Sequence, residues 1–159
     1  MPASCTVCIA LGSNMGDRAS HMAAARGALS KLPKTKLLAF SQTLETQPVG
    51  PIDQQAFFNA AAMISTELLP RELLDELNLI EAQRGRDRFK TRIKWGPRPL
   101  DLDIIFYQQQ VISEDDLTIP HPLMHQRWFV LKPLCEIAPD WVHPILEQTV
   151  TQLLAKVKP

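Results

Sequence analysis

The sequence predicts an α+β fold built around an antiparallel sheet. Short apolar runs rich in β-branched and aromatic residues, typical of strands, alternate with two stretches that have the apolar spacing of helices. Their order is strand, helix, strand, strand, helix, strand, followed by short additions towards the C-terminus. This is the order of the split βαβ arrangement of ferredoxin-like domains, so we expect two helices on one face of the sheet and the other face free for a ligand.

Length and composition narrow the class of protein. At 159 residues the chain has the size of one domain, which we assign to residues 1–159. Its net charge of +0 argues against nucleic acid or an anionic membrane as a partner, and no apolar segment is long enough to span a bilayer. Three cysteines and the absence of a signal-like segment before the first strand predict a reduced, cytoplasmic protein. We expect a monomer.

Residues 6–11 are expected to form the first strand. Cys5 and Cys8 would then point to opposite faces, which favours packing over a metal or redox pair. After a turn that contains two glycines, Asp17 is a suitable N-cap for a helix that Pro33 ends. The positions expected to be buried in this helix are Met22, Ala25, Leu29 and Leu32. The turn lacks the Lys-Ser/Thr pair of a P-loop, which favours a plain connector over a phosphate-binding loop.

Residues 35–43 and 56–66 are expected to form the next two strands, joined by a long loop over residues 44–55. Phe57 and Asn59 share one face of the second of these strands, because side chains alternate. Asn59 interrupts an apolar run, and its carboxamide must find hydrogen-bond partners there. Two interpretations remain open: the amide contacts a neighbouring loop, or it binds a flat polar ring together with Phe57.

Residues 70–84 have the clearest helical pattern, with Pro70 in the first turn and Gly85 after the last. A basic stretch follows, since seven of the 17 lysines and arginines lie between residues 84 and 98, with Asp87 as the single acid. Such a stretch is typical of a solvated loop, and it also suits a polyphosphate ligand.

A strand over residues 100–107 follows the basic stretch and carries two carboxylates. Asp101 and Asp103 project from one face, and Leu100, Leu102 and Ile104 from the other. Two carboxylates on one face repel each other and are costly to bury unless a cation lies between them. Because Mg²⁺ is commonly held by one or two carboxylates together with substrate phosphates, the pair suggests phosphate chemistry. Two solvated surface aspartates are the alternative.

The remaining elements are short. Residues 108–110 are expected to form a turn and residues 111–112 a strand. In the extended segment over residues 117–122, a proline stands on each side of His121 and stiffens the backbone. Helices are expected over residues 127–137 and 150–157.

Five motifs run in order along nearly the whole chain. They are Ile-Ala-Leu-Gly-Ser-Asn at 9–14 with Gly-Asp at 16–17, Thr-x-Pro-Val-Gly at 46–50, Phe-Asn-Ala at 58–60, Glu-x-x-x-Gly-Arg at 81–86, and Trp-Gly-Pro-Arg-x-Leu-Asp-Leu-Asp at 95–103. Pro-His-Pro at 120–122 and Arg127 accompany them. Together these motifs resemble the hydroxymethyldihydropterin pyrophosphokinase family of folate synthesis.

The resemblance implies transfer of the β,γ-pyrophosphoryl group of ATP to the hydroxymethyl oxygen of 6-hydroxymethyl-7,8-dihydropterin, with release of AMP. It implies that Asp101 and Asp103 hold two Mg²⁺ ions and that Arg86 and Arg98 complete the catalytic set. Of the other ATP contacts implied, those around the nucleoside are Leu74, Asn78, Glu81, Ile104 and Thr118. Those at the phosphates are His121 and Arg127, with Arg88 and Arg92 as candidates in the basic stretch. The pterin contacts implied are Asn14, Thr46, Pro48, Val49, Phe57, Asn59 and Phe129, and the pterin ring would stack between Phe57 and Phe129.

The chain departs from the family pattern at two positions. Phe57 stands where some members have tyrosine, which keeps a stacking ring without a hydroxyl, and Asp116 stands where some have arginine. Two other functions remain as alternatives. One is a metal-dependent nucleotidyl transferase that uses Asp101 and Asp103, and the other is an RNA-binding module that stacks bases on Phe57 and Phe129. The neutral net charge argues against both.

Overall fold

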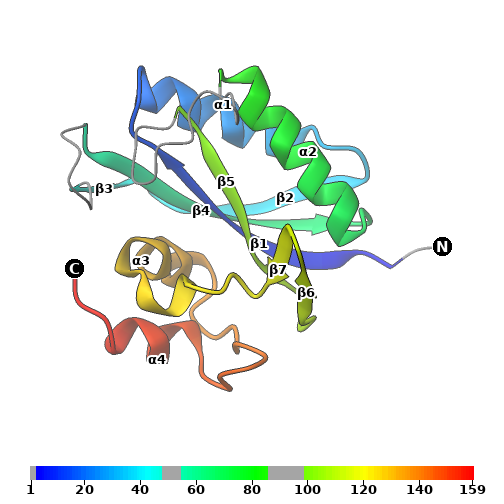
Figure 1. Cartoon of the computed structure of the whole chain (residues 1–159), viewed down its shortest axis with the longest axis vertical. Coiled ribbons are helices and arrows are strands. Elements are labelled where there is room, and N and C mark those ends of the chain that lie inside the picture. The colour runs from blue at the N-terminus through cyan, green and yellow to red at the C-terminus, as the bar shows by residue number, and fades with distance from the viewer. Residues whose placement is uncertain (1–2, 48–54, 86–98) are drawn as a thin grey trace.

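A computed structural model of the chain describes residues 3–47, 55–85 and 99–159 (Figure 1). At its centre is a five-stranded antiparallel sheet in which β2, β4, β1 and β5 lie side by side in that order, while β3 pairs with the start of β4. The strands are β1 (Cys5–Ser13), β2 (Thr35–Phe40), β3 (Leu44–Thr46), β4 (Phe57–Thr66) and β5 (Asp101–Tyr107). The four predicted strands of the sheet are confirmed, whereas the start of the predicted 44–55 loop is in fact strand β3.

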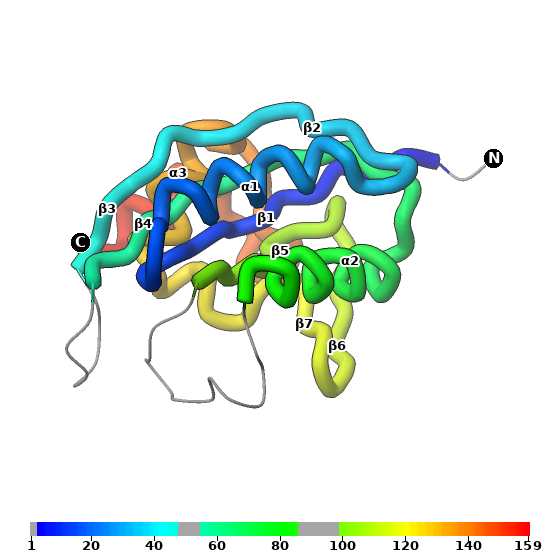
Figure 2. Tube along the Cα trace, turned by 90° about the horizontal axis from the view of Figure 1, so that it is seen from above, coloured from blue at the N-terminus to red at the C-terminus, as the bar shows by residue number. Residues whose placement is uncertain are grey.

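Helices cover both faces of this sheet. α1 (Arg18–Ser30) and α2 (Pro70–Gln83) lie across one face, and α3 (Trp128–Ile137) and α4 (Val150–Ala155) lie on the other (Figure 1). A short 3₁₀ helix, η1 (Met124–Gln126), precedes α3. Seen from above, α1 and α2 run along the strands, and the hairpin of β6 (Ile112–Glu114) and β7 (Leu117–Ile119) extends beside β5 and α2 (Figure 2). None of the helices in the described ranges is long and apolar enough to cross a membrane.

The first core lies between the sheet and the helices α1 and α2. It takes every second residue of the central strand, including Val7, Ile9 and Leu11. The four positions predicted to be buried in the first helix, Met22, Ala25, Leu29 and Leu32, all belong to it. The Asp17 side chain accepts a hydrogen bond from the Ser20 N–H at 3.0 Å, which confirms the predicted N-cap.

The second core lies on the opposite face of the sheet. Its sheet residues are Cys8, Ala61, Ile105 and Phe106, and they pack against Leu131, Leu134, Val150 and Leu153 of α3 and α4. The expectation that this face is free for a ligand was therefore wrong over the part that α3 and α4 cover. Both helices are apolar on one side, and burying that side against the sheet is favourable.

An irregularity in β5 helps to fill the second core. The pairing of β1 with β5 shifts at Cys8 and Ile9, whose partners are Phe106 and Ile104, so Ile105 is an extra residue. Such a bulge lets two consecutive side chains, Ile105 and Phe106, face the same core. The Phe106 ring also stacks on Trp141, with centroids 5.4 Å apart. Cys5 packs against the first core and Cys8 lies in the second, as the strand alternation predicts.

Candidate active site

One row of residues crosses three neighbouring strands on the second-core face of the sheet. Gly12 of β1 pairs with Asn59 of β4 on one side and with Asp101 of β5 on the other. In the next row along that face, Ala10 pairs with Ala61 and Asp103. Because strands are about 4.8 Å apart, Asn59 and the carboxylate pair lie roughly 10 Å from each other.

Gly12 and Ala10 form a floor of minimal side chains between these two groups, which we call the small-residue floor. A Cβ atom added at Gly12 would lie 3.4 Å from the Asn59 Oδ1 atom and 3.9 Å from Cδ1 of Phe57. The side-chain Oδ1 of Asn59 and the ring of Phe57 therefore both border the space above Gly12, which has no side chain. A flat ligand lying there would contact an amide and an aromatic ring at once.

Asn59 is 6% exposed, and its side-chain Nδ2 donates a hydrogen bond to the Thr46 Oγ1 at 2.8 Å. This bond confirms the first interpretation of Asn59, because Thr46 lies in the neighbouring 44–55 stretch. That part of the stretch is strand β3 and not a loop. This bond takes one part of the hydrogen-bonding capacity of the amide, which has two N–H donors and an acceptor oxygen. It fixes the amide plane, so the remaining groups keep a set direction towards the floor.

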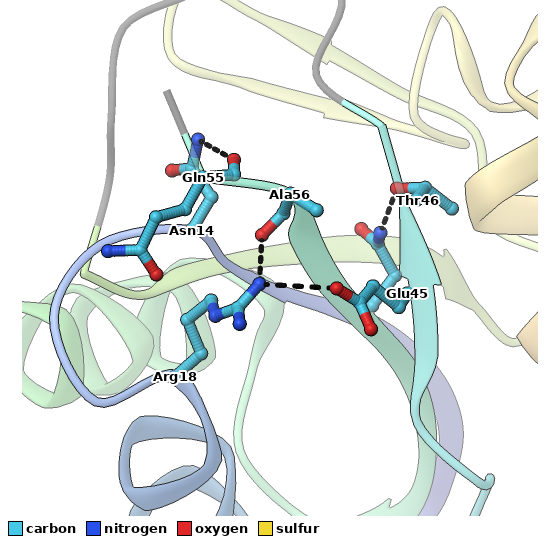
Figure 3. Close-up of polar contacts among 7 residues, drawn as sticks. Asn14, Arg18, Glu45, Thr46, Gln55 and Ala56 are labelled. Atoms are coloured by element: carbon cyan, nitrogen blue, oxygen red, sulfur yellow. Dashed lines mark hydrogen bonds and ion pairs between the residues drawn. The ribbon is translucent and has the colours of Figure 1, made fainter. Parts of the chain in front are cut away.

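Three more residues implied at the pterin lie around this end. Asn14 is 1% exposed and donates from Nδ2 to the Gln55 carbonyl oxygen at 3.4 Å (Figure 3). Phe57 is half-buried and pairs in register with Thr46. Phe129 is carried to the same side of the sheet by α3, which packs against β3 and β4. Pro48 and Val49 lie outside the described residues.

Asp101 and Asp103 are half-buried at the start of β5, and the leucines beside them lie in the first core, as predicted. The Leu102 N–H between the two aspartates donates to the Glu81 Oε2 at 2.7 Å. Glu81 is 2% exposed and comes from α2. It fixes the backbone that spaces the two carboxylates, a structural role that the resemblance did not imply.

His121 lies close to this pair in space. Its backbone N–H donates to the Ile105 carbonyl oxygen at 3.1 Å, and its Nδ1 accepts from the Leu123 N–H at 3.2 Å. Burial lowers the pKa of His121 from 6.5 to about 4; the positive charge of Arg127 adds to this shift, and the negative charge of Asp101 opposes it. At neutral pH the imidazole is therefore uncharged, and because Nδ1 is an acceptor, Nε2 carries the proton.

The residues implied at the nucleoside come from three adjoining elements, since α2 and β7 both pack against β5. Leu74 and Asn78 are half-exposed on α2, Thr118 is exposed on β7, and Ile104 is 5% exposed within the first core. The structure thus brings the elements together, although the Ile104 side chain itself is part of the core.

Asp116 takes part in an ion-pair network. Arg71 of α2 donates to the Asp116 carboxylate at 2.6 Å and to the Glu114 carboxylate at 2.8 Å. Both pairs are exposed, so each contributes little to stability. They join α2 to the β6–β7 hairpin on the side where the nucleoside is expected.

The basic residues Arg86, Arg88, Arg92 and Arg98 lie outside the described residues. The chain leaves the described part directly after α2 at Gly85 and returns at Pro99, two residues before Asp101. Arg127 is described, and its guanidinium carbon lies 5.8 Å from the centroid of the Phe129 ring.

The described part of the chain contains no group of three or more His, Cys, Asp or Glu side chains arranged to hold a metal. Two half-buried carboxylates on one face nonetheless fit Mg²⁺, which keeps several waters and takes its remaining ligands from substrate phosphates. Zinc and other metals that need a full protein ligand set fit this site poorly.

Sequence reasoning missed the small-residue floor and Arg18. The floor could have been found from strand alternation, because Ala10 and Gly12 follow Cys8 on one face. Arg18 could not, because its contacts join α1 to β3 and to the start of β4.

The sequence matches a family model described as "7,8-dihydro-6-hydroxymethylpterin-pyrophosphokinase (HPPK)" over residues 8–139. Similar proteins include the 2-amino-4-hydroxy-6-hydroxymethyldihydropteridine pyrophosphokinase of Haemophilus influenzae, which is 46% identical over 94% of this chain and 91% of its own length. The protein of that name from Bacillus subtilis is 43% identical over 81% of this chain and 75% of its own length.

Solved structures with the same fold include the HPPK-DHPS protein of Plasmodium falciparum. Its wild-type crystal structure superposes with a TM-score of 0.72 at 16% identity and covers 96% of this chain. The present chain spans 44% of that longer protein. At this identity the likeness concerns the fold alone.

Proposed function

Because the chain belongs to the 7,8-dihydro-6-hydroxymethylpterin-pyrophosphokinase family, we propose that the row across β4, β1 and β5 is its active site. The enzyme transfers the pyrophosphoryl group of ATP to the hydroxymethyl group of 6-hydroxymethyl-7,8-dihydropterin, a step of folate biosynthesis. The observation that carries the site assignment is the register that places Asn59, Gly12 and Asp101 side by side on one face. The pterin end and the phosphate end of the reaction then lie on the same face, and the β1 residues between them are Gly12 and Ala10.

The pterin lies over the small-residue floor beside Asn59. A pterin ring presents both donors and acceptors along its edge, and the Asn59 amide, fixed by Thr46, has both kinds of group. Phe57 and Phe129 supply the stacking surfaces. Asn14, Pro48 and Val49 complete the pterin contacts in this proposal.

Asp101 and Asp103 hold two Mg²⁺ ions together with the ATP phosphates. When bound, these ions neutralise phosphate charge and favour attack at phosphorus. The two carboxylates lie on the β5 side of the floor, where they would hold the ions, and Glu81 keeps the backbone between them in place. Arg86 and Arg98 act at the phosphates with them.

Neutral His121 donates from Nε2 to a phosphate oxygen, and Arg127 adds a permanent positive charge nearby. The other residues proposed for ATP are Leu74, Asn78, Glu81, Arg88, Arg92, Ile104 and Thr118. With these groups the substrate hydroxyl oxygen forms a bond to the β-phosphorus, the bond from that phosphorus to the α–β bridging oxygen breaks, and AMP leaves. The hydroxyl proton passes to solvent.

The proposal extends to finer features of the molecule. The strand order β2-β4-β1-β5, with α1 and α2 on one face, supports a ferredoxin-like arrangement with C-terminal additions. We further propose a single pterin pyrophosphokinase domain over residues 1–159 that works as a cytoplasmic monomer.

The test is to incubate the protein with ATP, Mg²⁺ and the reduced pterin and to identify the nucleotide released. AMP formed only when the pterin is present supports pyrophosphoryl transfer. ADP would indicate an ordinary kinase, and no turnover would contradict the assignment. Replacing Mg²⁺ by a chelator in the same assay tests the metal requirement, which turnover in the chelator would refute.

A further inference from the structure

Arg18, the first residue of α1, holds the segment that leads into β4. Its Nη1 donates a hydrogen bond to the Ala56 carbonyl oxygen at 2.7 Å and lies 3.7 Å from the Glu45 carboxylate (Figure 3). Its guanidinium carbon lies 4.2 Å from the centroid of the Phe58 ring. Arg18 therefore contacts the residues immediately before and after Phe57 in the chain.

These contacts lie behind the pterin end of the row. Phe58 packs against the first core, so Arg18 lies on the face covered by α1 and α2, while Phe57 and Asn59 face the other way. In the β3–β4 register Glu45 pairs with Phe58, directly beside the pair formed by Thr46 and Phe57. Arg18 thus links both strands that carry the proposed pterin contacts, without lying on the ligand's side of the sheet.

A second side chain from the same part of the chain acts on the neighbouring peptide. Asn14 donates to the Gln55 carbonyl oxygen and Arg18 to that of Ala56, so two consecutive carbonyl groups before Phe57 are both held by donors from around the β1–α1 turn. The Asn14 bond is long at 3.4 Å, and the Arg18 bond, at 2.7 Å from a charged donor, is the stronger of the two.

The three Arg18 contacts are unequal. The Glu45 carboxylate is 3.7 Å away on a side chain that is 59% exposed, so this ion pair contributes little. The Arg18 side chain is 23% exposed, and its bond to Ala56 and its position over the Phe58 ring are correspondingly less screened. The strongest restraint therefore acts on the peptide group that joins Ala56 to Phe57.

We propose that Arg18 is a positioning residue for the pterin: by fixing the peptide before Phe57, it sets the direction in which the Phe57 ring and the Asn59 amide meet the ligand. This inference rests on the proposed function. Arg18 acts through β4 and does not touch the reacting atoms.

The experiment compares Arg18→Met with Arg26→Met by steady-state kinetics with each substrate varied. Arg26 is on the same helix, and its guanidinium carbon lies 5.0 Å from the centroid of the Phe40 ring. Arg26→Met removes one charge and one ring contact, as Arg18→Met does. Only Arg18→Met also removes the hydrogen bond to Ala56, just before β4. Arg18→Met should raise KM for the pterin about tenfold, the equivalent of one charged hydrogen bond, with KM for ATP changed less than about twofold. Arg26→Met should change neither.

Arg18→Lys keeps a charged donor and should recover part of the pterin affinity; if Arg18→Met does not fold, the lysine variant alone should still show a raised pterin KM. An unchanged pterin KM in Arg18→Met, equal rises for both substrates, the same change in Arg26→Met, or no recovery in Arg18→Lys would each overturn the proposal. If the wild-type protein forms no AMP from ATP and the pterin, the proposed function itself fails, whatever the variants do.

Discussion

The second-core face of the sheet has two halves that differ in what their side chains do. In the closed half, Cys8, Ala61, Ile105 and Phe106 pack under α3 and α4. We call the other half the site half and define it by Asn59, Gly12, Asp101 and Asp103. Here the same three strands carry an amide, a glycine and two carboxylates. The same three strands run through both halves, and the pairing of β1 with β5 shifts register at the Ile105 bulge in the closed half. The two halves therefore differ in this bulge and in the chemistry of their side chains. Stability should depend mainly on the closed half and turnover on the site half, and variants should separate the two.

The largest effect is expected from Leu153→Ala in the closed half. Leu153 is 3% exposed on α4, far along the chain from every proposed site residue. Truncation should lower the free energy of unfolding by about 2–5 kcal/mol, through lost burial and the cavity left behind. Urea unfolding measures this loss, and KM values of the folded variant should stay close to those of the wild type. Lys156→Ala, an exposed change at the end of the same helix, is the control and should have little effect.

Asp101→Ala and Asp103→Ala should produce the reverse pattern in the site half. Each should lower kcat/KM at least about a hundredfold, or roughly 2.7 kcal/mol of transition-state stabilisation. The loss of turnover should be larger than any change in the free energy of unfolding, which urea unfolding of the same variants measures. Asp75→Ala, at an exposed position of α2, serves as the control. Near-normal turnover in either site variant would refute the metal role of the pair.

Gly12→Ala tests the small-residue floor with a single methyl group. The new Cβ would lie 3.4 Å from the Asn59 Oδ1, an ordinary contact, so the free protein should accommodate it. The methyl group would occupy space proposed for the pterin, and we expect the pterin KM to rise about tenfold, or roughly 1.4 kcal/mol. Gly27→Ala is the matched control, because a Cβ there would meet nothing within 4 Å. A normal pterin KM in Gly12→Ala would place the ligand elsewhere.

The smallest expected effect is a pH dependence of stability that arises from His143, whose ring contacts Phe106 of the closed half. His143 is 4% exposed, and burial, helped by the charge of His125, lowers its pKa below the ordinary 6.5. Above pH 6.5 the residue is neutral in both the folded and the unfolded chain. Below it the unfolded chain binds a proton that the folded chain resists, so stability should fall as the pH drops.

The measurement is the melting temperature of the ligand-free protein between about pH 7.5 and 5. His143→Asn keeps an acceptor for the N–H groups of Ile145 and Leu146, which the Nδ1 of His143 now binds at 3.1 and 3.0 Å. Its melting temperature should fall less steeply with decreasing pH than that of the wild type. Parallel curves for the two proteins would show that His143 does not titrate in this way.

The division between the halves was only partly predictable from the sequence. Strand alternation correctly placed Asp101 and Asp103 opposite Leu102 and Ile104, because the period of two is a local property of the backbone. The same rule put Phe57 and Asn59 on one face. The pairing of Gly12 with both Asn59 and Asp101 depends on how distant strands are aligned, which local spacing does not determine.

The closed half was missed for a related reason. The sequence predicts helices over residues 127–137 and 150–157 but not where they pack. A helical pattern does not say which surface its apolar side will cover. The bulge at Ile105 also left no sign in the sequence, since an apolar run reads the same with or without an extra residue. The contacts of Arg18 and Glu81 join parts of the chain that are distant in sequence, and the resemblance implied only a ligand role for Glu81.

The outer edge of the sheet at β5 gains a protection that has nothing to do with turnover. An edge strand offers unpaired backbone groups that can recruit a strand from another molecule and so begin aggregation. Here the Leu102 N–H is taken by the Glu81 side chain and the Ile105 carbonyl by the His121 backbone, so a foreign strand would find both groups occupied. Glu81 of α2, which fixes the backbone between the two aspartates, therefore also protects this edge of the sheet from pairing with another chain.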